Sequence, residues 1–329
     1  RNSIRKFYIK YRVLVKGFYL RRMRMKRILV TGALGQIGTE LVPALRNLYG
    51  SGNVLATDIR SSGSREITEG GPFALLDCRN GERLLSLVKS HQSDTIFHLA
   101  ALLSATAEAD PQKAWEVNME GLRIILEICR QEKCALFTPS SIAAFGPSSP
   151  KQGTPQDTVQ RPTTIYGITK VAGELLCDYY HKKYNVDARG VRYPGIISNA
   201  ACPGGGTTDY AVHIYYDAVK NGSYSCFLKP DTFLDMLYMP DALKAAVQLM
   251  EADPAKLSHR NAFNITAMSL SPETISQSIR EHIPGFKIDY EIDPLRQSIA
   301  DSWPQSLDDS ARSEERRVGN ECRSRWWRD

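Results

Sequence analysis

The fold follows from one stretch of the chain, Ile28-Leu29-Val30-Thr31-Gly32-Ala33-Leu34-Gly35-Gln36-Ile37-Gly38. Three apolar residues lead into glycines spaced three apart, and a segment with helical periodicity follows. This order predicts a buried parallel strand that turns sharply into a helix. Gly32 permits the tight turn, Gly35 lets backbone amides approach an anion, and Gly38 lets the helix lie close to the strand. The stretch therefore predicts a phosphate cradle at the helix N-terminus.

An acidic residue, Asp58, lies at the position where a dinucleotide-binding turn places its ribose-binding carboxylate. The apolar run Val54-Leu55-Ala56-Thr57 ends in Asp58, which lies 20 residues after Gly38. At this position an acidic side chain accepts hydrogen bonds from the adenosine ribose and repels the extra phosphate of NADP. Arg60 argues the other way, because an arginine can pair with that phosphate. Since Asp58 ends the strand, the pattern favours NAD as the cofactor.

The segments that follow alternate between strand-like and helix-like patterns. This alternation predicts an α/β protein with a Rossmann-like, doubly wound parallel sheet and a smaller C-terminal substrate lobe. We expect an NAD-binding domain over residues 27–193 and a substrate lobe over 194–311, with elements that return to the Rossmann core. The expected strands are 73–76, 95–99, 135–139, 233–239, 262–266 and 286–292, and the expected helices are 82–89, 111–133, 163–183, 209–220, 240–251 and 272–281.

Charge and cysteine content exclude several classes of function. The chain has 329 residues and a net charge of +6, but residues 1–27 hold eleven Lys and Arg and no acidic residue. The remaining 302 residues carry 31 basic and 36 acidic side chains, a net charge of −5, which gives no basis for nucleic-acid binding. The seven cysteines form no Cys-x-x-Cys pair and have no metal-ligand spacing, so we expect free thiols and no metal.

The basic leader, residues 1–26, interleaves Arg and Lys with aromatic and aliphatic residues. This composition is typical of a mitochondrial transit peptide and predicts a location in the matrix. Because the chain opens on Arg1, the alternative is upstream sequence with the true start at Met23 or Met25, and a cytoplasmic protein. The apolar stretches of the leader are too short to span a membrane, so no membrane partner is expected.

A second constellation, Tyr166-Gly167-Ile168-Thr169-Lys170, begins a helical segment that runs on through Glu174. Tyr166 and Lys170 are four residues apart and therefore share one helix face. A nearby ammonium stabilises a phenolate and lowers the tyrosine pKa, which makes the phenol a usable base near neutral pH. Ser141 lies 25 residues before Tyr166. The sequence thus predicts Ser141, Tyr166 and Lys170 as a catalytic group.

The order of these motifs resembles the extended short-chain dehydrogenase/reductase superfamily. Within it, five further stretches are similar to the short-chain type of L-threonine 3-dehydrogenase, namely residues 99–104, 139–146, 192–195, 203–210 and 301–304. The resemblance covers Lys26 to Ala311. The tail, 312–329, departs from it, with six arginines, four acids and Trp326-Trp327. We interpret this tail as non-native sequence joined to a truncated chain.

The resemblance implies oxidation of L-threonine at its 3-hydroxyl to 2-amino-3-oxobutanoate, with NAD as hydride acceptor. Tyr166 matches the proton acceptor, Lys170 also holds the nicotinamide ribose, and Ser141 orients the substrate. The implied substrate contacts are Ser104, Ser141, Thr208 and Trp303, the last as an apolar lid. The expected cofactor contacts are Gly32, Gly35, Gln36, Ile37, Gly38, Asp58, Ile59, Arg60, Asp77, Cys78, Leu99, Ala100, Ala101, Asn118, Tyr166, Lys170, Pro194 and Ile196. Relatives pair the helices over 111–133 and 163–183 into a four-helix bundle, which implies a homodimer.

Two other functions use the same fold. A nucleotide-sugar epimerase or dehydratase has the same Tyr, Lys and NAD but needs basic residues for a diphosphate, and residues 199–210 contain none. A regulatory protein that senses NAD typically loses the tyrosine or the lysine, and this chain keeps both.

Overall fold

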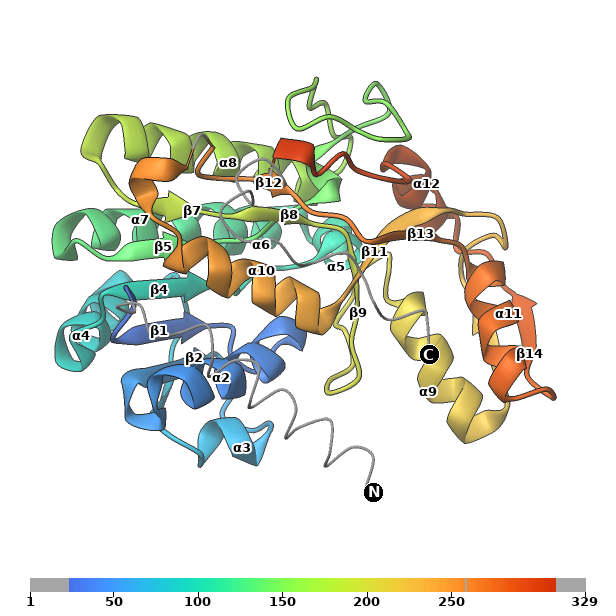
Figure 1. Cartoon of the computed structure of the whole chain (residues 1–329), viewed down its shortest axis with the longest axis horizontal. Helices are drawn as coiled ribbons and strands as arrows, with labels where there is room; N and C mark the ends of the chain where they lie inside the picture. Colours follow the sequence, from blue (N-terminus) through green and yellow to red (C-terminus); the bar gives the residue numbers. More distant parts are fainter. Residues whose placement is uncertain (1–23, 258, 312–329) are drawn as a thin grey trace.

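The computed structural model describes residues 24–257 and 259–311, so the predictions for residues 1–23 and for the tail, 312–329, lie outside it. Its centre is a six-stranded parallel sheet with strand order β3-β2-β1-β4-β5-β7 (Figure 1). The strands are β1 (Ile28–Thr31), β2 (Val54–Asp58), β3 (Phe73–Leu75), β4 (Thr95–His98), β5 (Ala135–Phe137) and β7 (Ala188–Arg189). The order reverses between β1 and β4, which is where ligands bind in open α/β sheets. The predicted Rossmann-like fold is confirmed.

Helices cover both faces of this sheet. In β1, Ile28 and Val30 point into the core under α2 (Gln36–Tyr49) and α10 (Met239–Glu251), and Leu29 points into the opposite core. Because both faces are buried, β1 is apolar without alternation. The opposite core is built by α4 (Gly81–His91), α7 (Gly121–Glu132) and α8 (Ile165–Tyr184). The short helix α3 (Arg65–Thr68) and the 3₁₀-helices η1 (Ser51–Asn53) and η4 (Pro254–Lys256) complete the part of the protein built around the six-stranded sheet.

A smaller lobe lies at the right of Figure 1 and has its own apolar core. It contains α9 (Tyr210–Asn221), α11 (Pro272–His282), α12 (Pro294–Ser302) and the strands β9 (Gly195–Ile197), β10 (Ser223–Cys226), β11 (Leu234–Tyr238), β13 (Met268–Leu270) and β14 (Lys287–Tyr290). Between lobe and sheet run α5 (Ser104–Ala109), η3 (Ile142–Ala144) and a second small sheet of β6 (Ser140–Ser141), β8 (Val191–Tyr193) and β12 (Phe263–Asn264). The start of α8, at Tyr166, packs in the core of the lobe, and its later part, at Cys177 and Tyr180, packs in the core against the sheet, so α8 joins the two parts.

Besides short elements that were not predicted, such as β8, β9 and β10, two details differ from the sequence predictions. The helix expected over 111–133 contains a π-helical turn, η2 (Glu116–Glu120), between α6 (Pro111–Trp115) and α7. In addition, the folded part begins before residue 27. Met25 is buried in the core, and the backbone amides of Arg24 and Lys26 donate to Glu251 and Asp94. Among the described residues, no helix combines the length and the apolar composition needed to cross a membrane.

Candidate active site

The glycine turn, residues 32–38, packs directly against the strand ends. Gly32 has φ +67°, and a Cβ there would lie 2.7 Å from the amide nitrogen of Ala100. A Cβ on Gly38 would lie 2.5 Å from the carbonyl oxygen of Gly32. In the described part of the chain no side chain caps α2, and its first turn carries no acidic residue. The first amides of α2, from Gln36 to Gly38, are therefore free to bind an anion, and this cradle fits the pyrophosphate of a dinucleotide.

Asp58 and Arg60 lie together beside this turn. The Asp58 carboxylate is 4 % exposed and accepts from the backbone amide of Leu34 at 2.9 Å. Its other oxygen accepts from the backbone amide and the Nε of Arg60, at 3.0 and 3.1 Å. The carboxylate thus ties the end of β2 to the glycine turn, and the Arg60 guanidinium lies against Asp58. Ile59, between them, is exposed.

Asp77 and Cys78 follow β3, the edge strand next to β2. A hydrogen bond from Arg79 holds the pKa of Asp77 below its usual range. Burial raises the pKa of the Cys78 thiol to about 11. Cys78 is 5 % exposed and faces Gly121, where a Cβ would lie 3.0 Å from its Sγ. Cys78 therefore packs as a small apolar residue in this structure.

The structure brings Ser141, Tyr166 and Lys170 together. Ser141 ends β6 and hydrogen-bonds Tyr166, which is 8 % exposed. The Lys170 ammonium lies 5.4 Å from the centre of the Tyr166 ring and donates to the carbonyl of Pro139 at 2.8 Å. These three side chains come from β6 and the first two turns of α8, and they meet beyond the carboxyl ends of the central strands.

The charge balance at Tyr166 differs from the sequence prediction. Burial raises the pKa of Tyr166 to about 12, and the hydrogen bond with Ser141 acts in the opposite direction. Burial also lowers the pKa of Lys170 to about 8, against an opposing effect of Glu174. The predicted net lowering of the Tyr166 pKa is therefore wrong. The physical reason is that loss of water around the phenol outweighs its other interactions.

Two polar residues near the strand ends, His98 and Asn118, are hydrogen-bonded within the fold. His98, which sequence analysis missed, ends β4. Its Nδ1 lies 2.8 Å from the Thr31 hydroxyl oxygen. Burial lowers its pKa to about 3, with a smaller effect of Lys170 in the same direction, so the ring is neutral. Asn118, in the π-helical turn, accepts from the amide of Leu102 at 2.8 Å and donates to its carbonyl at 3.1 Å. The Asn118 side chain thus holds the segment after β4, and its predicted contact with the cofactor stays a prediction. Leu99, Ala100 and Ala101 begin that segment.

The predicted substrate residues are buried or half-buried at the lobe. The Ser104 hydroxyl bonds the hydroxyl of Thr207 at 2.9 Å and accepts from its amide at 3.0 Å. In this structure Ser104 therefore fixes the segment that carries Thr208. Thr208 lies against Gly195, where a Cβ would come 2.9 Å from its Cγ2. Trp303 is 5 % exposed, packs in the core that includes Tyr166, and has an Nε1 without a partner among the described residues.

Pro194 and Ile196 stand where the sheet passes into the lobe. The side-chain amide of Gln36, in the glycine turn, donates to the carbonyl of Ile196 at 3.1 Å and to the Ser198 hydroxyl at 2.9 Å. Farther on, the carboxylate of Asp209 accepts from the amides of Gly205 and Gly206 at 2.8 and 2.7 Å. The segment between β9 and α9 is thus anchored to the glycine turn at one end and shaped by Asp209 at the other.

With this geometry in view, the comparisons identify the class of protein. The chain belongs to the NAD dependent epimerase/dehydratase family, whose model matches residues 28–266. It is 58 % identical over 291 residues to an uncharacterized epimerase/dehydratase of Staphylococcus saprophyticus, with 88 % of this chain and 91 % of that protein covered. Among solved structures it is similar to the L-threonine dehydrogenase of Clostridium difficile, at 57 % identity and a TM-score of 0.87, covering 91 % of this chain and 94 % of that one. A monomeric L-threonine 3-dehydrogenase from a metagenome shares 43 % identity at a TM-score of 0.84, covering 88 % and 92 %.

These relatives correct one prediction and leave another open. The mitochondrial location inferred from the basic leader is wrong, because the relatives at 54 to 58 % identity are staphylococcal, and bacteria have no mitochondria. A basic, acid-free segment has the composition of a transit peptide without being one. Because one similar structure is described as monomeric, the homodimer stays a prediction.

Proposed function

We propose that this protein oxidises L-threonine at its 3-hydroxyl, with NAD as the cofactor. The observation that carries the proposal is the joint placement of Ser141, Tyr166 and Lys170 beside a dinucleotide-type glycine turn, in a chain 57 % identical to an L-threonine dehydrogenase. Residues 199–210, which border the proposed substrate lobe, contain no Lys or Arg. This favours a small substrate over one that carries a diphosphate.

The chain's own residues account for the proton. When NAD is bound, it supplies the ring that accepts the hydride from C3 of threonine. Tyr166 takes the hydroxyl proton as the C3–O bond becomes a carbonyl, and Ser141 holds the substrate oxygen within reach of the phenol. The Lys170 ammonium, 5.4 Å from the centre of the Tyr166 ring, is placed to oppose the effect of burial on the phenolate and to hold the nicotinamide ribose. Removal of one hydride and one proton from threonine gives 2-amino-3-oxobutanoate.

The alternative is a sugar-nucleotide epimerase or dehydratase, and the staphylococcal relatives are named as uncharacterized epimerase/dehydratases. The deciding assay follows NADH at 340 nm with L-threonine, L-allo-threonine and L-serine as separate substrates, and follows UDP-glucose by chromatography of its products, because an epimerase or dehydratase returns the hydride and forms no net NADH. We expect formation of NADH with L-threonine above the other two amino acids. Turnover of UDP-glucose without turnover of threonine would show that the protein is a sugar-nucleotide enzyme and not a threonine dehydrogenase.

Cofactor choice should change when Asp58 loses its charge. Asp58→Asn keeps an oxygen that accepts from the Leu34 amide. It loses the negative charge that repels the NADP phosphate, and it weakens the hydrogen bonds that the carboxylate accepts from the ribose. A hydrogen bond to a charged group contributes about 1.5–3 kcal/mol, so we expect KM for NAD to rise at least roughly tenfold and NADP to become a substrate. Steady-state kinetics with both cofactors measure this. Asp253→Asn, in the exposed cap of η4, serves as the control, and an unchanged NAD to NADP ratio in Asp58→Asn would refute the assignment.

The dimer has a specific candidate surface. Large apolar side chains are exposed along α6 and α8, namely Trp115, Ile168, Leu175, Tyr179 and Tyr184. We propose that two copies bury this surface against each other. Light scattering after size exclusion should give twice the chain mass of 36.8 kDa, and Leu175→Arg should halve it. Val219→Arg, at a still more exposed apolar site on α9, should leave the dimer intact. A monomer mass for the unaltered protein would contradict the proposal.

A further inference from the structure

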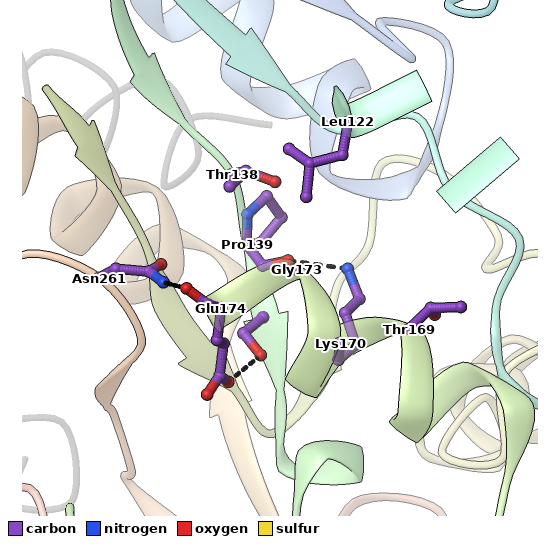
Figure 2. A pocket seen from close by; sticks show the side chains of 9 residues that line it. Leu122, Thr138, Pro139, Thr169, Lys170, Gly173, Glu174 and Asn261 are labelled. Carbon is purple, nitrogen blue, oxygen red and sulfur yellow. Dashed lines mark hydrogen bonds between the residues drawn. The ribbon is translucent and has the colours of Figure 1, made fainter. Parts of the chain in front are cut away.

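A buried ion pair lies directly behind the catalytic group. Glu174, one helical turn beyond Lys170, receives Nε and Nη2 of Arg192 on its two carboxylate oxygens, at 3.0 and 2.8 Å. Both side chains are 6 to 7 % exposed. The Ser140 hydroxyl and the Gln160 amide donate to the same carboxylate, the latter at 2.9 Å. Figure 2 shows Glu174 and Lys170 on α8, with the Lys170 ammonium bonded to the Pro139 carbonyl. These residues line a small cavity of about 20 Å³.

Three side chains of α8, spaced four residues apart, each hold one residue of the segment 139–141. Tyr166 bonds Ser141, Lys170 bonds the carbonyl of Pro139, and Glu174 bonds Ser140. Residues at this spacing lie in one row along a helix. Two of these contacts involve the proposed catalytic side chains. The third contact joins Glu174 to Ser140, the residue next to Ser141 in β6. Glu174 can therefore hold Ser141 in position although its own side chain has no proposed contact with the substrate.

Glu174 also faces Lys170 with a negative charge. The charged and titratable groups around Lys170 are Tyr166, Glu174 and Cys177 on α8, His98 on β4 and, behind Glu174, Arg192 on β8. His98 is neutral and Cys177 keeps its proton, because burial of each group disfavours its charge. Glu174 is thus the anion that favours the ammonium form of Lys170. Without the Glu174 carboxylate, the buried Arg192 guanidinium would lose its counter-ion on the side of Lys170 from which Glu174 now acts.

We propose that Glu174 and Arg192 are positioning residues of the dehydrogenase reaction, in which Glu174 holds Ser140 so that Ser141 faces Tyr166, keeps Lys170 protonated, and is itself held by Arg192. The proposal rests on the proposed function and adds two residues that touch neither substrate nor cofactor.

The test is the pH profile of Glu174→Gln. The amide keeps the shape and an acceptor for Ser140, but it leaves Arg192 as an uncompensated cation near Lys170. Because this disfavours the ammonium form, we expect Lys170 to lose its proton at lower pH, and the alkaline limb of kcat to move down by about one pH unit, a tenfold loss at the most affected pH. KM for NAD should stay within about twofold. Asp178→Asn, one turn further along α8, removes an acid that bonds Asn261 and should leave the profile unchanged.

Two further variants separate charge from shape. Glu174→Gln combined with Arg192→Met removes both charges and should return the alkaline limb to its original pH. Ser140→Ala keeps both charges and should lower kcat without moving the limb. If Glu174→Gln does not fold, as judged by circular dichroism, these two variants decide the outcome. A folded Glu174→Gln with an unchanged limb, or a double variant whose limb stays displaced, would overturn the proposal.

The 13Cε chemical shift of Lys170, assigned with Lys170→Met, provides a readout that needs no substrate. Titration should show the same displacement in Glu174→Gln as the pH profile. If the unaltered protein fails to oxidise threonine but the Lys170 titration moves as expected, the proposed function fails and the electrostatic role of Glu174 stands. If threonine is oxidised and the titration does not move, the inference fails alone.

Discussion

Tyr166→Phe is expected to lower kcat for threonine oxidation by about 10²- to 10⁴-fold, the usual contribution of a general base. The variant removes one oxygen and keeps the buried ring, so Lys170 retains its place 5.4 Å from the ring centre. Ser141 loses its partner but still accepts from the amide of Ala143. Binding of the cofactor should therefore survive, and the Kd for NADH, measured by fluorescence titration, should change by less than about threefold.

Tyr180→Phe is the matched control for this variant. Tyr180 lies on the same helix, but it packs in the opposite core and its hydroxyl faces Glu127 of α7 at 3.5 Å. Its loss should leave kcat within about twofold of the unaltered enzyme. If Tyr166→Phe kept more than a tenth of the activity, the proton acceptor would have to be another group.

Gly38→Ala should abolish the cradle itself. The added Cβ would lie 2.5 Å from the Gly32 carbonyl oxygen and 2.6 Å from that of Ala33. Both contacts are with backbone, which cannot rotate away, so α2 must shift from β1 to admit a methyl group. Overpacking of this kind costs about 1–3 kcal/mol of the free energy of unfolding. Because the shift also displaces the free amides of α2, we expect NAD affinity to fall at least roughly tenfold.

Denaturant unfolding and NADH titration of Gly38→Ala measure the two effects together. Gly52→Ala is the matched control, because a Cβ at Gly52 meets nothing within 4 Å. It should leave both the free energy of unfolding and the cofactor affinity unchanged. Normal NAD binding by a Gly38→Ala protein of normal stability would show that the close approach of α2 to β1 is not required.

The sheet was predictable because its determinants are local. Apolar runs, glycine spacing and helix periodicity sit within a few residues of each other, so β1, β2, β4 and the helices between them follow from the sequence. Short strands such as β8 and β9 did not, because three residues carry no period and their pairing depends on distant partners. The π-helical turn at Glu116–Glu120 has no local sequence pattern that we recognised.

The residues of the site could be predicted from the sequence better than their pKa values and hydrogen-bond partners. Tyr166 and Lys170 follow from a four-residue spacing, but the direction of the Tyr166 pKa depends on burial, which is set by tertiary packing. The ligand contacts predicted for Asn118 and Ser104 stay predictions, and the structure adds the bonds of Asn118 to Leu102 and of Ser104 to Thr207, which the sequence alone does not reveal. Glu174 continues the spacing of Tyr166 and Lys170, and this was the available signal. Arg192 gave none, because its partner lies on another element.

The most direct test of the central claim uses L-threonine labelled with deuterium at C3. We expect the deuterium to appear on the nicotinamide ring of the product NADH, detected by mass spectrometry, in an amount equal to the 2-amino-3-oxobutanoate formed. The Tyr166→Phe protein should transfer it at least roughly a hundredfold more slowly. Absence of deuterium from the NADH, in a folded protein that binds the cofactor, would contradict threonine oxidation as the function of this chain.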